Sequence, residues 1–196
     1  MKAWAIALAL AGSAVSTPAL AAGGAAAPAL EAAAASIAPN RFVWADSEGL
    51  EPVSLVVSIA DQRAYVYRGQ TLIAVSSVST GAADKPTPAG TYPILQKKVT
   101  HKSNLYDDAP MPFMQRLTWD GIALHAGRNP GFPASHGCVR LPTAFAKKLF
   151  AVTSVGSTVT IMDEPFASGD GWTPPVPEPD ADTARANTLQ IASLER

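Results

Sequence analysis

Residues 54–76 read SLVVSIADQRAYVYRGQTLIAVS, and this stretch decides the fold class. It holds three runs rich in β-branched and aromatic residues, separated by short polar or glycine-containing breaks. Runs of this length with such short breaks are typical of antiparallel strands joined by tight turns. The stretch therefore predicts a β-meander with strands at 54–59, 64–67 and 71–76.

Further strands are predicted on the C-terminal side of the meander, at 91–95, 122–124 and 158–162. One helix is predicted over 143–152, because a proline precedes it, two large apolar residues share one face at i,i+4, and a glycine follows it. We therefore expect a mostly β fold, with antiparallel strands and one or two short helices.

The first 21 residues have the pattern of a signal peptide. Lys2 is followed by an apolar run, and Ala19-Leu20-Ala21 fits the small-x-small pattern of a signal-peptidase site. The apolar run is short for a membrane span. We expect export to the periplasm or cell envelope, with no stable membrane insertion after cleavage. An uncleaved N-terminal anchor is the alternative.

Composition divides the rest of the chain into three parts. Residues 22–49 form an alanine-rich stretch that we expect to be a linker, with a local helix near Glu31 as the alternative. Residues 50–163 hold the patterned strands and predict one folded domain. Residues 164–196 are rich in Pro, Asp and Glu, which is typical of a disordered tail.

Net charge and apolar content narrow the classes of partner. The formal net charge of −1 offers no electrostatic basis for binding nucleic acid. A hydrophobic content of 47% is enough for one domain with a proper core. We expect the mature protein to be a monomer.

The chain has one cysteine, Cys138, in the run ASHGCVRLP at 134–142, and His125 lies a short way upstream. Exported proteins usually pair their cysteines, and this thiol has no partner within the chain. A nucleophilic thiol needs a base within hydrogen-bond reach and backbone N–H donors for the developing oxyanion. The amides of Gly137 and Cys138 are the natural donors. A helix starting near Pro142 would lower the thiol pKa if its N-terminus pointed at the site.

Two other roles are open to these side chains. A lone cysteine is often a buried structural thiol. Thiolate and imidazole are also the preferred ligands of zinc, and Cys138 with His125, His136 and His101 would supply four. No carboxylate or second cysteine lies close by in the sequence, and His101 lies in a predicted loop, which argues against zinc. Thiol acyl transfer supplies its own nucleophile and base, so we expect neither a metal nor an organic cofactor.

The block around Cys138 resembles the signature of the L,D-transpeptidase (YkuD-type) catalytic domain, a histidine followed by Ser/Thr-His-Gly-Cys. Two upstream pieces resemble the same family. One is VSTG at 78–81 with TPAGTY at 87–92, and the other is MPFM at 111–114 ahead of GIALHAG at 121–127. The resemblance covers roughly residues 50–162.

The resemblance implies an antiparallel β-sandwich and a role for each residue of the block. Cys138 would attack the carbonyl of a diamino acid in a peptidoglycan stem peptide and release the terminal D-residue. His125 would be its base, oriented by a backbone carbonyl such as that of Ala126. His136 would shape the site and hold substrate or thiolate. An amine of a second stem peptide, or water, would resolve the thioester.

Two features, a loop length and one residue, depart from the common family pattern. The loop from His125 to Ser135 is shorter than in many members, and Ser135 itself either caps a turn or shapes the site. Arg140 stands where many members have Asn, and a guanidinium there could bind a stem-peptide carboxylate through paired hydrogen bonds.

The leading hypothesis is thus an L,D-transpeptidase that cross-links peptidoglycan stem peptides or exchanges their terminal D-amino acid. An L,D-carboxypeptidase, or a hydrolase that detaches a wall protein, would use the same thioester. A non-catalytic wall-binding protein is the hypothesis from another class.

Overall fold

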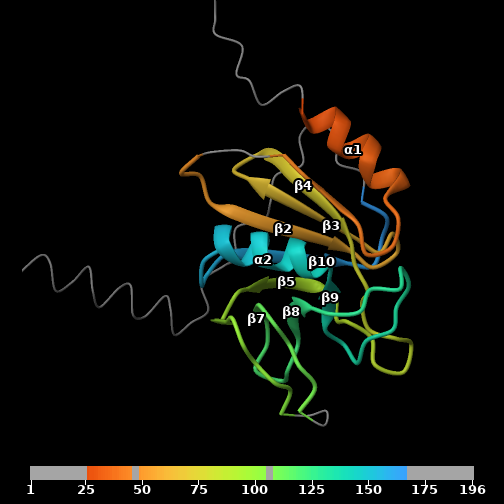
Figure 1. The fold of residues 1–196 in the computed structure, drawn as a ribbon, viewed down its shortest axis with the longest axis vertical. Coiled ribbons are helices and arrows are strands. Elements are labelled where there is room, and N and C mark those ends of the chain that lie inside the picture. The colour runs from red at the N-terminus through yellow and green to blue at the C-terminus, as the bar shows by residue number, and fades with distance from the viewer. Residues whose placement is uncertain (1–25, 46–48, 105–107, 167–196) are drawn as a thin grey trace, which may run out of the picture.

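The computed structural model describes residues 26–45, 49–104 and 108–166 (Figure 1). The predicted signal peptide at 1–21 and nearly all of the predicted tail at 164–196 lie outside these residues, so both stay predictions. Among the described residues, no helix is long and apolar enough to cross a membrane.

The larger sheet has six strands and contains the predicted meander. Its neighbours run in the order β1-β4-β3-β2-β10-β5. The strands are β1 (Phe42–Trp44), β2 (Val53–Ser58), β3 (Arg63–Arg68), β4 (Thr71–Ser77), β5 (Gly90–Pro93) and β10 (Thr158–Met162). β2, β3 and β4 pair antiparallel, as the sequence predicts, whereas β10 pairs parallel to β2.

The smaller sheet has four strands in the order β6-β7-β8-β9. They are β6 (Gln96–Lys98), β7 (Met114–Arg116), β8 (Ala123–Ala126) and β9 (Val139–Leu141). β8 and β9 are parallel, which requires a crossover between them, and the segment 127–138 supplies it. The fold is mostly β with two helices, as expected, but both sheets are mixed rather than purely antiparallel.

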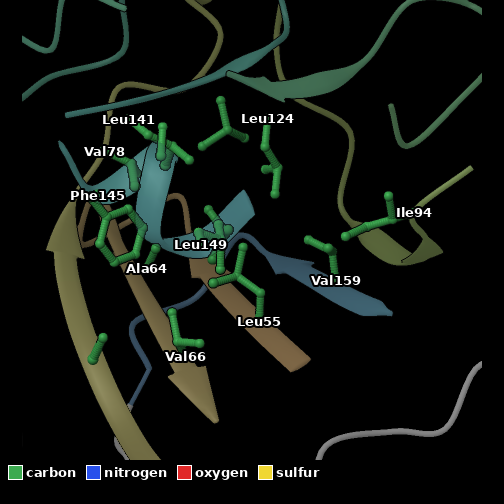
Figure 2. Close-up of a cluster of buried hydrophobic side chains, with 14 of the residues drawn as sticks. Leu55, Ala64, Val66, Val78, Ile94, Leu124, Leu141, Phe145, Leu149 and Val159 are labelled. Atoms are coloured by element: carbon green, nitrogen blue, oxygen red, sulfur yellow. The ribbon is translucent and has the colours of Figure 1, made fainter. Parts of the chain in front are cut away.

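The predicted helix forms as α2 (Thr143–Val152) and lies between the two sheets. Figure 2 shows Phe145 and Leu149 of α2 among apolar side chains of the larger sheet, with Leu124 and Leu141 approaching from the smaller one. Each such large side chain contributes about 1.5–3 kcal/mol on burial. This shared core holds β8 and β9 in place.

The segment expected to be a linker contains a packed helix, α1 (Ala26–Ser36), which is the alternative that the alanines favoured. Leu30 and Ala34 share one face of α1, and together with Ile37, just past its end, they are buried against the outer face of the larger sheet. The Arg63 guanidinium donates hydrogen bonds of 2.9 Å to the carbonyls of Ala34 and Ile37. These contacts explain why a segment with few large apolar residues is nonetheless ordered.

The chain then continues along the edge of the larger sheet as β1, which pairs with β4. The rings of Phe42 and Trp44 each lie 5.6 Å from the ring of Phe145 in α2. Residues 26–45 therefore pack on the outer face of the larger sheet through α1 and contact α2 through β1.

Candidate active site

Side-chain alternation on β8 and β9 places His125 and Cys138 on the same face of the smaller sheet. His125 pairs with Arg140, and Cys138 lies two positions before Arg140 at the entrance to β9. Cys138 immediately precedes β9 (Val139–Leu141), and extending the alternation of that strand back by one residue puts Cys138 on the face of Arg140 and diagonal to His125. The opposite face points into the core and carries Leu124, Ala126, Val139 and Leu141.

This face borders a cavity of about 740 Å³, and most of the predicted site residues line that cavity. Cys138, His125, Ser135, His136 and Arg140 all line it. Gly137 is buried and is not part of the lining. Segments 109–112 and 126–129 complete much of the wall. Cys138 and His125 therefore share one cavity. Their roles as nucleophile and base stay predictions.

His125 is buried, and its Nδ1 lies 2.8 Å from the carbonyl oxygen of Ala126. A carbonyl only accepts, so Nδ1 carries the proton and Nε2 keeps a free lone pair. Burial lowers the pKa of His125, Arg140 and His101 lower it further, and the Ala126 hydrogen bond opposes this. The imidazole is therefore neutral at neutral pH and able to accept a proton.

Cys138 is partly exposed, and its Sγ donates a hydrogen bond of 3.4 Å to the carbonyl of Gly121. Burial raises the pKa of the thiol, while the Ala123 N–H, Arg140 and Arg116 oppose that rise. β9 lies between Cys138 and the start of α2. The pKa of the thiol is raised, so the lowering that a helix N-terminus at the site would cause is not found. The thiol is protonated at rest, so it needs a base before it can attack.

Ser135 fixes the loop that carries Cys138. Its Oγ donates to the Cys138 carbonyl at 2.5 Å and accepts from the Gly137 N–H at 3.1 Å. The Gly137 N–H is thus engaged within the loop, although the sequence suggested it as an oxyanion donor. Of the two expected donors, the Cys138 N–H is the one left for that role. Gly137 has φ 108°, and an added Cβ would lie 2.9 Å from Ile122 Cδ1. The positive φ requires glycine here, whereas the end of the Ile122 side chain could move aside.

Thr87 holds the same loop from the other side. Its buried Oγ1 accepts from the Gly81 N–H at 2.8 Å and donates to the Gly137 carbonyl at 2.7 Å. From the sequence, Thr87 is expected only to set turn geometry. The only signal was its place in TPAGTY, one of the two upstream pieces, and the pattern does not say which atoms Thr87 binds.

Arg140 is positioned by both its backbone and its stem. Its N–H and C=O pair with Ser79 at 2.9 and 3.0 Å. A Cβ at Gly127 would lie 3.2 Å from Arg140 Cγ and 3.4 Å from His125 Cε1, so this glycine makes room for both side chains. The cavity lining includes Arg128 as well as Arg140, and among the described residues it includes no Asp or Glu. Such a lining favours an anionic ligand.

His136 is exposed and lines the cavity, whereas His125 in the same lining is buried. Over the described parts of the chain, no three His, Cys, Asp or Glu side chains come together as metal ligands would. The zinc alternative therefore gains no support from the arrangement of His101, His125, His136 and Cys138.

Comparison with known proteins agrees with this geometry. The family model of the L,D-transpeptidase catalytic domain (YkuD) matches residues 52–161. A search of curated proteins found no match. Among solved structures, an L,D-transpeptidase from Stackebrandtia nassauensis is 28% identical with a TM-score of 0.53. That match covers 61% of this chain and 60% of the other.

Two further solved structures share the fold. An L,D-transpeptidase from Mycobacterium tuberculosis H37Rv is 21% identical with a TM-score of 0.54, and the match covers 57% of each chain. An L,D-transpeptidase in complex with imipenem is 23% identical with a TM-score of 0.53, and the match covers 57% of this chain and 59% of the other. This chain thus spans about three fifths of the length of the solved chains it matches.

The family match covers more than half of the chain, and it contains the strands and loops that gather His125 and Cys138 in one cavity. The chain belongs to the L,D-transpeptidase (YkuD) catalytic domain family.

Proposed function

We propose that this protein is an L,D-transpeptidase that acts on peptidoglycan stem peptides through a thioester on Cys138. The observation that carries the proposal is the placement of Cys138 and His125 on one face of β8 and β9, within one cavity, with His125 Nδ1 held by Ala126. Membership of the L,D-transpeptidase family supports acyl transfer on peptidoglycan peptides as the chemistry.

The proposed reaction begins with proton transfer, because the resting thiol is protonated. His125 Nε2 takes the proton from Cys138 Sγ, and the sulfur attacks the carbonyl carbon of the diamino acid in the donor stem. The Cys138 N–H stabilises the oxyanion. As the C–N bond breaks, His125 returns the proton to the departing D-amino acid, and a thioester remains.

An amine of a second stem peptide then attacks the thioester. His125 removes a proton from that amine and delivers it to the sulfur, which restores the thiol as the new amide bond forms. Arg140 lines the same cavity as His125 and would bind a stem-peptide carboxylate through paired hydrogen bonds. Water in place of the amine would give the L,D-carboxypeptidase or wall-protein-detaching hydrolase.

The test uses a carbapenem, because a solved relative is an L,D-transpeptidase in complex with imipenem. Purified protein incubated with imipenem should gain the mass of one adduct, measured by intact mass spectrometry. Cys138→Ala should gain none, and His125→Ala should react much more slowly. A wild-type protein that stays unmodified would refute the thioester proposal.

Product analysis on muropeptides with tetrapeptide stems separates the possible outcomes. Cross-linked dimers, or stems with an exchanged terminal residue, support transpeptidation. Tripeptide monomers alone would identify the carboxypeptidase. Unchanged muropeptides, with sacculus binding preserved in Cys138→Ala, would indicate the non-catalytic wall-binding protein.

We also propose that the protein is exported and acts in the periplasm, on the basis of the sequence pattern at 1–21. N-terminal sequencing of protein recovered from the periplasm should give a chain that starts at Ala22. Recovery of a chain that still begins at Met1 would support the uncleaved anchor instead.

A further inference from the structure

A tight turn at Ala38–Arg41 lies between α1 and β1, before the part of the chain that matches the family. The Arg41 N–H donates to the Ala38 carbonyl at 3.2 Å, which closes the turn. Pro39 is its second residue, and Asn40, with φ 59°, is its third. Proline followed by a residue of positive φ is the pattern of a type II turn, and asparagine tolerates positive φ better than most residues.

The turn is fixed to the crossover that joins β8 to β9. The Ser77 hydroxyl accepts from the Arg41 N–H at 3.2 Å and from Asn129 Nδ2 at 3.0 Å, and donates to the Arg41 carbonyl at 3.1 Å. A Cβ at Gly131 would lie 2.5 Å from Pro39 Cγ. The turn therefore packs directly on the crossover, at a glycine with φ 89°.

This packing brings Asn40 into the lining of the cavity that also holds Cys138 and His125. Its side chain is exposed, and it makes no hydrogen bond to any other described residue. The neighbouring Asn129 differs, because its amide nitrogen and oxygen are engaged by Ser77 and by the Gly131 N–H. The Asn40 carboxamide is therefore available to a ligand.

We propose that the turn Ala38–Arg41 forms one wall of the substrate site and that the Asn40 carboxamide binds the stem peptide directly. The identity of that ligand rests on the proposed function. A carboxamide can donate to a carboxylate or pair with a peptide group, and Arg128 in the same lining adds positive charge. Asn40 would then determine how tightly this chain holds its substrate, although it lies outside the matched range 52–161.

The test measures binding in the Cys138→Ala background, so that no reaction takes place. The probe is a stem tetrapeptide ending in a diamino acid and D-alanine, titrated by calorimetry. Asn40→Gly should weaken binding about fivefold, which corresponds to one lost hydrogen bond of about 1 kcal/mol. Glycine is the right replacement because it keeps the positive φ and removes only the carboxamide.

Asn40→Asp gives a second readout that a purely structural role would not change. Its carboxylate should weaken binding more than Asn40→Gly does, and lowering the salt concentration should widen the difference, because screening is weaker. Gln70→Gly, an exposed turn residue away from the cavity lining, is the matched control and should bind as the parent does. Thermal melts of each variant check that the fold is kept.

In the active enzyme, Asn40→Gly should raise KM for the tetrapeptide about fivefold and leave kcat within about twofold. Unchanged affinity in both Asn40 variants, or a parent that does not bind the tetrapeptide, would overturn the inference. The proposed function fails separately, through a wild-type protein that forms no carbapenem adduct, and that result leaves the binding comparison valid.

Discussion

The hydroxyl of Thr87 donates a 2.7 Å hydrogen bond to the carbonyl of Gly137, 50 positions later in the chain. The same oxygen accepts from the Gly81 N–H, so a single buried atom connects two loops to the residue that precedes Cys138. The position of the sulfur therefore depends on a side chain that takes no part in the proposed reaction.

Thr87→Val keeps the shape of this side chain and removes the hydroxyl. The Gly81 N–H and the Gly137 carbonyl would lose their buried partner, at a cost of about 1–3 kcal/mol in the free energy of unfolding. Imipenem acylation of Cys138 should slow at least tenfold, because the loop that carries Cys138 loses the hydrogen bond from Thr87 to the Gly137 carbonyl. Urea denaturation and time-resolved intact mass check both effects. Thr71→Val, at an exposed position of β4, is the matched control and should change neither.

The rate of acylation should depend on pH through His125. Burial lowers the pKa of this imidazole from its ordinary value of 6.5, so the base stays unprotonated to a lower pH than a free histidine would. We expect the acylation rate to fall only below pH 6.5 and to be level near neutrality. An inflection above pH 6.5 in a stopped-flow pH series would contradict this assignment.

The His125→Ala variant should show a different pH profile. Without the base, only the small fraction of thiolate reacts, and burial raises the pKa of Cys138 above its ordinary value of 9.0. Its acylation rate should therefore keep rising with pH into the alkaline range. A level rate near neutrality in this variant would mean that another group removes the proton.

Stability should also fall at acid pH because of His125. The folded pKa is lowered, so below about pH 6.5 the unfolded chain binds a proton more readily than the folded one, and protonation favours unfolding. The free energy of unfolding should decrease as the pH falls from 6.5 through the folded pKa of His125. His125→Gln should make this decrease shallower in urea titrations between pH 7 and 5. An identical slope in both proteins would refute the contribution of His125.

Lys97 provides a test of stability away from the site. Its Nζ donates to the carbonyls of Phe150 and Thr153 at the C-terminal end of α2, where a positive charge also favours the helix dipole. Lys97→Met should lower the free energy of unfolding by about 1–2 kcal/mol and leave the acylation rate of folded protein unchanged. Lys98→Met, at an exposed position of the same strand, should have little effect on either. Equal destabilisation by the two variants would show that the capping bonds contribute nothing.

Local pattern predicted the parts of the fold whose residues contact mainly their chain neighbours. The meander at 54–76 and the helix at 143–152 form as expected, because hairpins and an amphipathic helix leave a short-range signature in sequence. The parallel pairs β2–β10 and β8–β9 leave no such signature. Whether α1 would be ordered was also hard to predict, because its few apolar residues are buried by strands that lie far away in the sequence.

The sequence predicted which residues line the candidate site, but not the electrostatics around them. The block around Cys138 indicated a thiol and an imidazole, and the structure places Cys138 and His125 in one cavity. The pKa of the thiol is raised because the loops around it exclude water, which the sequence does not show. Thr87 and Asn40 were missed because each approaches the site from a distant part of the chain.

The hydrogen bond from Cys138 Sγ to the Gly121 carbonyl has a consequence for the lifetime of the protein. Peroxides and disulfides react with the ionised form of a cysteine, so a sulfur that keeps its proton is oxidised slowly. In a compartment without a reducing system, a permanently ionised sulfur would soon be lost to sulfenic acid. Under the proposed mechanism, the burial that keeps the Cys138 thiol protonated, and so requires His125 as its base, also protects the sulfur between reactions.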